Sequence, residues 1–185
     1  MPGAQFVPLS DGSTFIVGWE VDAAPGTGID LLSATNLGNP IWAQDGTHSL
    51  DMVGTPGPGS IFQDLTTTPG ASYLLSFYVS SNGPAKTNGL TVGWGNLFGT
   101  TSTPALGTWQ QIILPVVATG TTTRLRFIGN LVPGQGNLQG SLLDNVSVDP
   151  VVANPVPEPA TLAIWGLGAA GFGLIYRRRR SNFKR

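Results

Sequence analysis

The feature that most constrains this chain is an uncharged apolar run near its C-terminus. The run covers 17 residues, from Ala160 to Tyr176, and four consecutive arginines, Arg177, Arg178, Arg179 and Arg180, follow it. A helix of that length reaches about 25 Å, slightly less than a bilayer core of about 30 Å, and a soluble helix does not need to be apolar on every face. Because basic flanking residues stay in the cytoplasm, we expect a transmembrane helix at 160–176, a cytoplasmic tail at 177–185, and residues 1–155 outside.

The motif before this run is a second signal. Val156, Pro157, Glu158 and Pro159 immediately precede the helix, so a Pro-Glu-Pro motif, a short apolar helix and an arginine cluster follow one another. This order resembles the bacterial PEP-CTERM sorting signal. The resemblance implies that exosortase, a membrane protease-transpeptidase, recognises residues 156–185 and removes the tail. The alternative is an ordinary single-span anchor, in which small residues such as Gly166 and Ala170 pack against another helix.

Charge and composition limit what the outer part can bind. Residues 1–155 carry three basic and nine acidic residues, a net charge of −6, whereas the tail holds six of the nine basic residues of the chain. A domain of this sign is a poor partner for nucleic acid, so we expect none to bind. The chain has no cysteine, which excludes a disulfide framework, a thiolate zinc site and a cysteine nucleophile.

The N-terminus does not match the export that the tail predicts. Residues 1–6 contain neither a basic segment nor an apolar run, so they do not form a signal peptide. We therefore expect residues 1–9 to be a poorly defined start that lacks both a signal peptide and a first strand.

Short segments of alternating apolar and polar residues dominate residues 10–149. The segment 72–80 is the clearest, because Leu75, Phe77 and Val79 share one face. Nine such segments, with Gly- and Pro-rich turns and no amphipathic helix, predict an all-β sandwich with jelly-roll topology, followed by a linker at 150–155. Two of the segments, 89–95 and 108–118, are apolar on both faces and are expected inside a sheet. The predicted strands are 14–22, 28–33, 49–53, 60–67, 72–80, 89–95, 108–118, 122–128 and 141–149.

An ordered series of motifs in residues 10–149 carries a second resemblance. The series comprises Gly18-Trp19-Glu20-Val21, Ile29-Asp30-Leu31-Leu32, the stretches 45–52, 58–61 and 68–77, and Leu143-Asp144-Asn145-Val146-Ser147-Val148. It resembles the galactose-binding-like domain of the choice-of-anchor C family, which is related to a plant cell-wall domain family of poorly defined function. That family opens with an additional strand, which residues 5–11 do not match.

Asp144 is the candidate metal ligand. In the last predicted strand it shares a face with Leu142 and Val146, and a carboxylate on an apolar face must be paired, hydrogen-bonded or bound to a metal. The resemblance implies a structural calcium at this position, because related sandwiches use an aspartate of the closing motif to hold one. The alternative is that Asp144 caps backbone amides at a strand end. No other cofactor is expected.

Aromatic residues are the remaining candidates for a binding site, because sugar rings stack on them. Trp42 lies in a loop and is the candidate carbohydrate-binding residue, whereas Trp19 and Trp94 have the inward parity of core residues. His48 is the only histidine and has no nucleophile-elbow motif with it, which disfavours a Ser-His-Asp triad. No catalytic residue is identified, and we expect the chain not to be an enzyme.

These observations predict an exported surface or extracellular-matrix protein that exosortase processes. We expect it to be structural or adhesive and to associate with exopolysaccharide. The precursor would lie in the bacterial inner membrane with its N-terminus outside, and the processed protein at the cell surface or in the matrix. A carbohydrate-binding module with a defined glycan ligand is the alternative. A glycoside hydrolase that uses Glu20, Asp51 or Asp64 is the least favoured.

Overall fold

The computed structural model describes residues 4–24, 27–54, 57–131 and 139–152. The chain divides into two compact units, Met1–Val151 and Val152–Arg185, and nearly all described residues belong to the first. The predicted transmembrane helix, the sorting motif and the arginine tail lie outside the described residues. Within those residues, no helix is long and apolar enough to cross a membrane.

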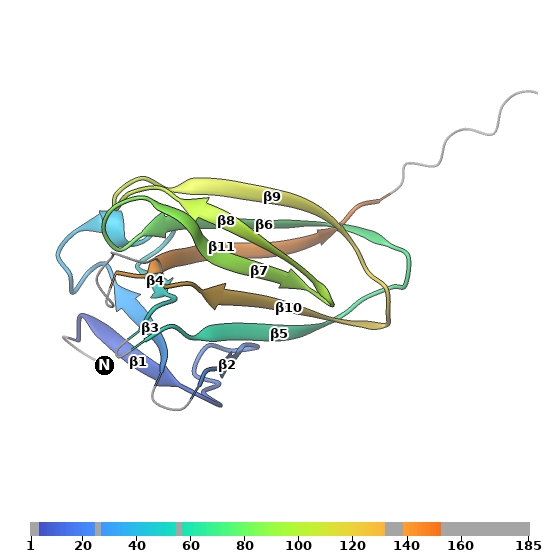
Figure 1. Cartoon of the computed structure of the whole chain (residues 1–185), viewed down its shortest axis with the longest axis horizontal. Helices are drawn as coiled ribbons and strands as arrows, with labels where there is room; N and C mark the ends of the chain where they lie inside the picture. Colours follow the sequence, from blue (N-terminus) through green and yellow to red (C-terminus); the bar gives the residue numbers. More distant parts are fainter. Residues whose placement is uncertain (1–3, 25–26, 55–56, 132–138, 153–185) are drawn as a thin grey trace, which may run out of the picture. The chain divides into compact units, whose positions relative to one another are not determined.

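Two antiparallel sheets form the first unit, with its core between them (Figure 1). Six strands make one sheet in the order β1-β3-β4-β11-β6-β9, and five make the other in the order β2-β5-β10-β7-β8. The strands are β1 (Phe6–Ser10), β2 (Glu20–Asp22), β3 (Gly28–Ser33), β4 (His48–Asp51), β5 (Ser60–Thr66), β6 (Ser72–Ser81), β7 (Lys86–Trp94), β8 (Leu97–Thr103), β9 (Gln110–Val117), β10 (Thr122–Gly129) and β11 (Ser141–Pro150). A short 3-10 helix, η1 (Pro40–Trp42), lies between β3 and β4. The predicted all-β sandwich is confirmed.

The core follows the alternation that the sequence shows. In β6, Leu75 and Phe77 are completely buried, and the Phe77 ring meets Phe127 of β10 edge-on, with ring centroids 5.1 Å apart. Burial of one such side chain stabilises the fold by roughly 1.5–3 kcal/mol. Trp94 of β7 is also buried, as its parity predicts, and its indole N–H donates to the carbonyl of Val117 at 3.0 Å.

The predicted strand at 14–22 is wrong over most of its length, because only its last three residues, in β2, are extended and paired. Phe15 and Val17 are 61% and 94% exposed. Gly18 has a φ of 82°, a left-handed conformation, and lies in a turn that the amide of Trp19 closes by donating to the carbonyl of Ile16 at 2.9 Å. In contrast, β1 pairs with β3 although it begins where the sequence predicts no strand.

Two lateral strands also differ from the prediction. The sequence places β9 inside a sheet, but it forms the outer edge of the six-stranded sheet. Ile113 is 55% exposed there, and Pro115 suits an edge because it has no amide hydrogen to donate. No strand is predicted for β8, whose Thr and Gly residues give no apolar alternation. β7, by contrast, lies between β10 and β8, in the interior position predicted for it.

β11 contains a bulge that changes which of its residues point inward. Its pairing with β6 shifts between Asp144 and Ser147, and Asn145 has a φ of 47°. Leu143 packs into the core before the bulge and Val146 packs against it afterwards, so the inward parity moves by one residue. β11 pairs with β6 at eight positions but with β4 at only two.

The buried carboxylate of Asp51 links the end of β4 to residues that follow β4 and β6. Asp51, at the end of β4, is 2% exposed and accepts the amide of Val53 at 3.0 Å and the side-chain amide of Asn82 at 2.7 Å. Burial raises the pKa of Asp51 to about 6; the two donors oppose this shift and the nearby Asp30 adds to it. Gly140 has no room for a side chain, because a Cβ there would overlap the Asp51 carboxylate.

Candidate functional site

The bulge in β11 moves Asp144 off the apolar face on which the sequence places it. Its carboxylate accepts the backbone amides of Gln44, Asp45 and Asn145 at 2.8, 3.1 and 2.7 Å. Burial raises the pKa of Asp144, and the three amides act against that shift. This is the capping arrangement considered as the alternative to a calcium ligand. In the part of the chain that the structure describes, no three His, Cys, Asp or Glu side chains gather to hold a metal, so calcium at Asp144 stays a prediction.

Trp42 ends η1, on the loop that also caps Asp144. It is half-buried, and its carbonyl accepts the hydroxyl of Ser49 at 2.5 Å. The indole N–H of Trp109 donates to the neighbouring carbonyl of Ile41 at 3.1 Å. These two hydrogen bonds hold the η1 loop in place through the carbonyls of Trp42 and Ile41. The structure therefore brings the two predicted site residues to one loop, and stacking of a sugar on Trp42 stays a prediction.

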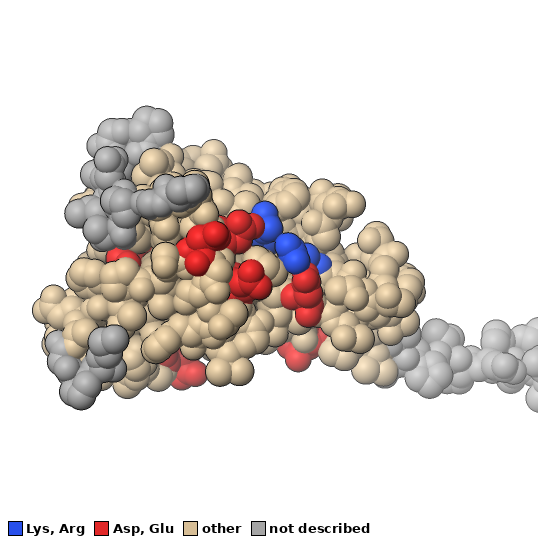
Figure 2. Space-filling view, turned by 90° about the horizontal axis from the view of Figure 1, so that it is seen from below, with Lys and Arg blue, Asp and Glu red and all other residues tan. Residues whose placement is uncertain are grey.

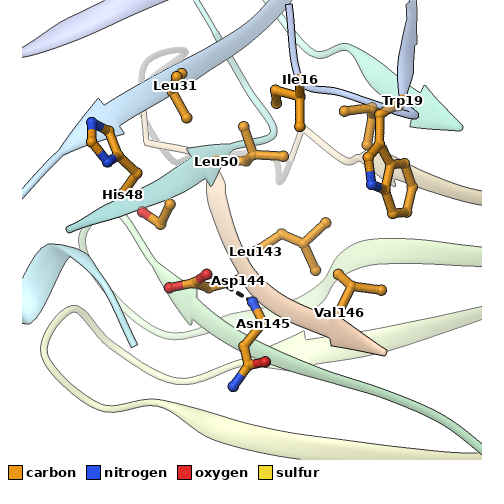
Figure 3. A pocket seen from close by; sticks show the side chains of 11 residues that line it. Ile16, Trp19, Leu31, His48, Leu50, Leu143, Asp144, Asn145 and Val146 are labelled. Atoms are coloured by element: carbon orange, nitrogen blue, oxygen red, sulfur yellow. Dashed lines mark hydrogen bonds between the residues drawn. The ribbon is translucent and has the colours of Figure 1, made fainter. Parts of the chain in front are cut away.

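A cleft of about 230 Å³ opens beside Asp144, between the two sheets (Figure 3). Apolar side chains such as Trp19 and Val146 form much of its wall, and the exposed His48 lies at its rim. Trp19 also contacts the core ring of Phe127, with centroids 6.0 Å apart. His48, Ser49 and Asn145 add polar groups to the lining, and three backbone amides already donate to the Asp144 carboxylate.

A row of residues from all five strands crosses the outer face of the five-stranded sheet. From β2 to β8, the register aligns Glu20, Phe62, Arg126, Gly93 and Phe98. Neighbouring strands lie about 4.8 Å apart, so β5 and β8 are separated by roughly 14 Å. The row and the side chains two residues from it on the same face, Arg124, Asp64 and Asp22, form an extended surface, which we call the arginine face.

Two arginines at the centre of the arginine face are held by acidic residues. Arg124 donates to both carboxylate oxygens of Asp64, at 2.8 and 2.7 Å, and Arg126 pairs with Asp22 at 2.7 Å. The Arg124 guanidinium also lies 3.9 Å from the centre of the Phe62 ring, a cation–π distance. Its hydrogen bonds lower the pKa of Asp64. Figure 2 shows the basic side chains as one group with acidic side chains on both sides.

Phe98 provides an aromatic platform at the β8 end of the row. A Cβ built on Gly93 would lie 2.5 Å from a carbon of the Phe98 ring, so the ring occupies the space that a side chain would need. Phe98 nevertheless remains 59% exposed. The ring therefore rests over the glycine and presents its other side to solvent, where an apolar sugar face can stack.

Hydrogen-bonding groups flank the row on both sides. A hollow of about 280 Å³ beside Phe62 is lined in part by Glu20 and Gln63. Toward β8, the hydroxyl of Thr100 donates to the side-chain oxygen of Asn88 at 3.1 Å. One exposed ring, that of Phe98, together with a few placed donors and acceptors is a composition that suits a site for small polar ligands.

Sequence reasoning did not identify the arginine face as a site. The alternation in β10 predicts that Arg124 and Arg126 face outward, which is correct, but it does not predict which acidic residues they pair with. Arg124 and Asp64 are 60 residues apart, and only the register of β10 with β5 brings them together. In β5, Phe62 and Asp64 alternate with inward-facing residues. This alternation is the signal that could have placed both side chains on the outer face.

Comparisons with known proteins concern both the tail and the sandwich. The profile of the PEP-CTERM protein-sorting motif matches residues 155–180, which include the Pro-Glu-Pro motif and the arginine cluster. No curated protein sequence matches the chain significantly. Among solved structures, TmCBM61 in complex with β-1,4-galactotriose aligns with a TM-score of 0.52 and 9% identity, over 77% of this chain and 97% of its own. The sandwich is similar in fold to this carbohydrate-binding module.

Two further solved structures align with the chain. A structure described as "CBM4 structure and function" aligns with a TM-score of 0.50 and 15% identity, over 80% of this chain and 97% of its own. The CBM22-1 xylan-binding domain of Paenibacillus barcinonensis Xyn10C aligns with a TM-score of 0.48 and 15% identity, over 75% and 89% of the two chains. At these identities the likeness concerns the fold alone.

Proposed function

We propose that this chain is an exported surface protein whose β-sandwich binds glycans through the arginine face. The observation that carries the proposal is the row from Phe62 through Arg126 to Phe98, in which exposed aromatic surface lies beside charged hydrogen-bonding groups. The fold of a carbohydrate-binding module and the sorting motif support it. The protein acts by binding and does not catalyse a reaction.

The sorting motif supports a defined path to the surface. Exosortase recognises Val156-Pro157-Glu158-Pro159 in a precursor that the helix at 160–176 holds in the bacterial inner membrane. Residues 1–155 lie outside and residues 177–185 in the cytoplasm. Removal of the tail transfers the sandwich to the cell surface or the extracellular matrix, where it contacts exopolysaccharide.

Each part of the arginine face suits one part of a sugar. The exposed ring of Phe98 accepts the apolar C–H side of a pyranose. The paired groups of Arg124 and Asp64 supply donors and acceptors to hydroxyls. The hollow beside Phe62 receives the edge of a neighbouring sugar unit. The ligand of TmCBM61 makes β-1,4-galactan the first probe to use.

Titration of the full chain, purified in mild detergent, with β-1,4-galactan, xylan and mannan tests the binding proposal. We expect saturable binding to at least one of them by isothermal calorimetry. A Trp42→Ala variant that still unfolds cooperatively separates this face from the predicted stacking site on Trp42, because binding like that of the wild type would support the arginine face. Loss of binding in that variant would place the ligand on the η1 loop, and absence of binding to every polysaccharide would contradict the proposal.

Expression in a bacterium that contains exosortase tests the sorting proposal. Glu158→Ala should leave an unprocessed precursor in the inner-membrane fraction, detected on an immunoblot against the sandwich, whereas the wild type should appear shortened. Replacing Arg177 to Arg180 by alanine should also prevent correct processing. Identical processing of all three proteins would exclude the motif as the recognition element.

A purely structural matrix protein is the second candidate. The same residues that form the arginine face also stabilise the sheet, because the Arg124–Asp64 pair joins β10 to β5 and the Phe98 ring covers Gly93. The resemblance to the choice-of-anchor C family is compatible with either role. A folded chain that binds none of the polysaccharides would favour this second candidate.

A further inference from the structure

Both guanidinium groups of the arginine face are already occupied by carboxylates of the same chain. Arg124 holds Asp64 through two hydrogen bonds, and Arg126 holds Asp22 through an ion pair at 2.7 Å. Glu20 adds a third carboxylate to the row, opposite Phe62 in the register. These five charged groups sum to a net charge of −1.

An anionic sugar would find no free positive charge on this surface. A uronate or sulfate normally pairs with an arginine that can direct two N–H groups at it. Here it would have to displace Asp64 or Asp22, and each displaced carboxylate would stay close by and repel it. The outer part of the chain offers no compensation, because its nine acidic residues outnumber its three basic ones.

An uncharged sugar hydroxyl matches the paired arrangement better. A hydroxyl donates one hydrogen and accepts others, whereas a carboxylate only accepts. Each oxygen of Asp64 receives one N–H from Arg124 and keeps further acceptor capacity. An arginine also carries five N–H donors, more than Asp64 uses. The pair therefore offers acceptors and donors side by side.

We propose that Asp64 and Asp22 are specificity-determining residues that restrict the arginine face to uncharged glycans and exclude uronate-containing polysaccharides. This inference rests on the proposed glycan-binding function. Asp64 and Asp22 occupy the guanidinium groups with which an anionic sugar would pair. Replacing both aspartates frees these groups, so the surface then accepts anions.

The test uses the full chain in mild detergent with matched neutral and anionic polysaccharides. β-1,4-Mannan and polymannuronate share the β-1,4 backbone linkage and differ by a carboxylate at C6. The variants are Asp64→Asn, Asp22→Asn and the double variant, and Asp149→Asn removes an exposed acid from the other sheet as the control. Thermal unfolding confirms that each variant is folded.

We expect the wild type and Asp149→Asn to bind the neutral polymers and to bind the anionic ones at least about tenfold more weakly. The double variant should gain about tenfold in affinity for the anionic polymers, and added salt should weaken this gained binding. Equal binding of anionic polymers by the wild type, or no gain in the folded double variant, would overturn this inference and leave the proposed function intact. Failure of the wild type to bind any polysaccharide would overturn both.

Discussion

At the scale of single residues, Phe98 depends on a neighbour that has no side chain. Its ring sits over Gly93 in the adjacent strand, and this contact fixes the platform without burying it. The pairing is invisible in the sequence, because it depends on the register of β7 with β8. The same holds for Arg124 and Asp64, whose alternation predicts only that each side chain faces outward.

Removing the platform should weaken glycan binding and preserve the fold. Phe98→Ala deletes a ring that is 59% exposed, so we expect a loss of about 1 kcal/mol in binding, roughly fivefold, with little change in thermal stability. Phe15→Ala removes a ring that is 61% exposed elsewhere and is the matched control. Calorimetry with the best neutral polysaccharide measures both, and equal effects would argue against a platform role.

The buried Asp51 should make the protein more stable in mild acid. Its pKa is about 6 in the folded chain against 3.8 for a free aspartate, so between these values the folded state holds a proton that the unfolded state releases. Stability should therefore fall as pH rises from about 4 to 6, by up to ~3 kcal/mol. Asp144, whose pKa is also raised by burial, acts in the same direction.

Urea unfolding of the full chain in detergent between pH 4 and 7.5 would measure this dependence. Asp51→Asn cannot titrate, so its stability should change much less over the same interval. A wild-type curve that rises steadily with pH through this window would contradict the assignment.

At the scale of strands, the sequence predicts elements well where one face is apolar and the other polar. β5 and β6 begin at the predicted residues, because their apolar positions alternate toward a single core. The alternation of apolar and polar residues predicts the strands poorly in two places. Gly18 turns the chain within an apparently alternating segment, and β9 is apolar on both faces although it is an edge strand.

The bulge in β11 explains why Asp144 could not be placed from parity. Strict alternation assumes one residue per pairing position, whereas the bulge adds a residue and reverses the faces. The pattern contains one hint in retrospect, because Asn145 is a residue type that tolerates a left-handed backbone.

Asn145 should be sensitive to side chains that avoid positive φ. Asn145→Val places a β-branched residue at a φ of 47°, and we expect a loss of roughly 1–2 kcal/mol in unfolding free energy. Asn145→Gly loses the same side-chain hydrogen bond to Gln44 but accepts the backbone geometry, so it isolates the conformational effect. Equal stability of the two variants would show that the bulge imposes no constraint.

At the scale of the whole molecule, the position of β11 determines how the module withstands tension. This strand lies inside its sheet, and the chain leaves it at Pro150 toward the sorting tail. A pull on that end acts along the strand and at right angles to the hydrogen bonds of its eight pairings with β6, so these bonds must be sheared together instead of being opened one after another. If flowing water pulls on a cell that the protein holds through this end, the sandwich is loaded in shear along β11, and the edge strand β9, which does not pair with β11, carries little of that force.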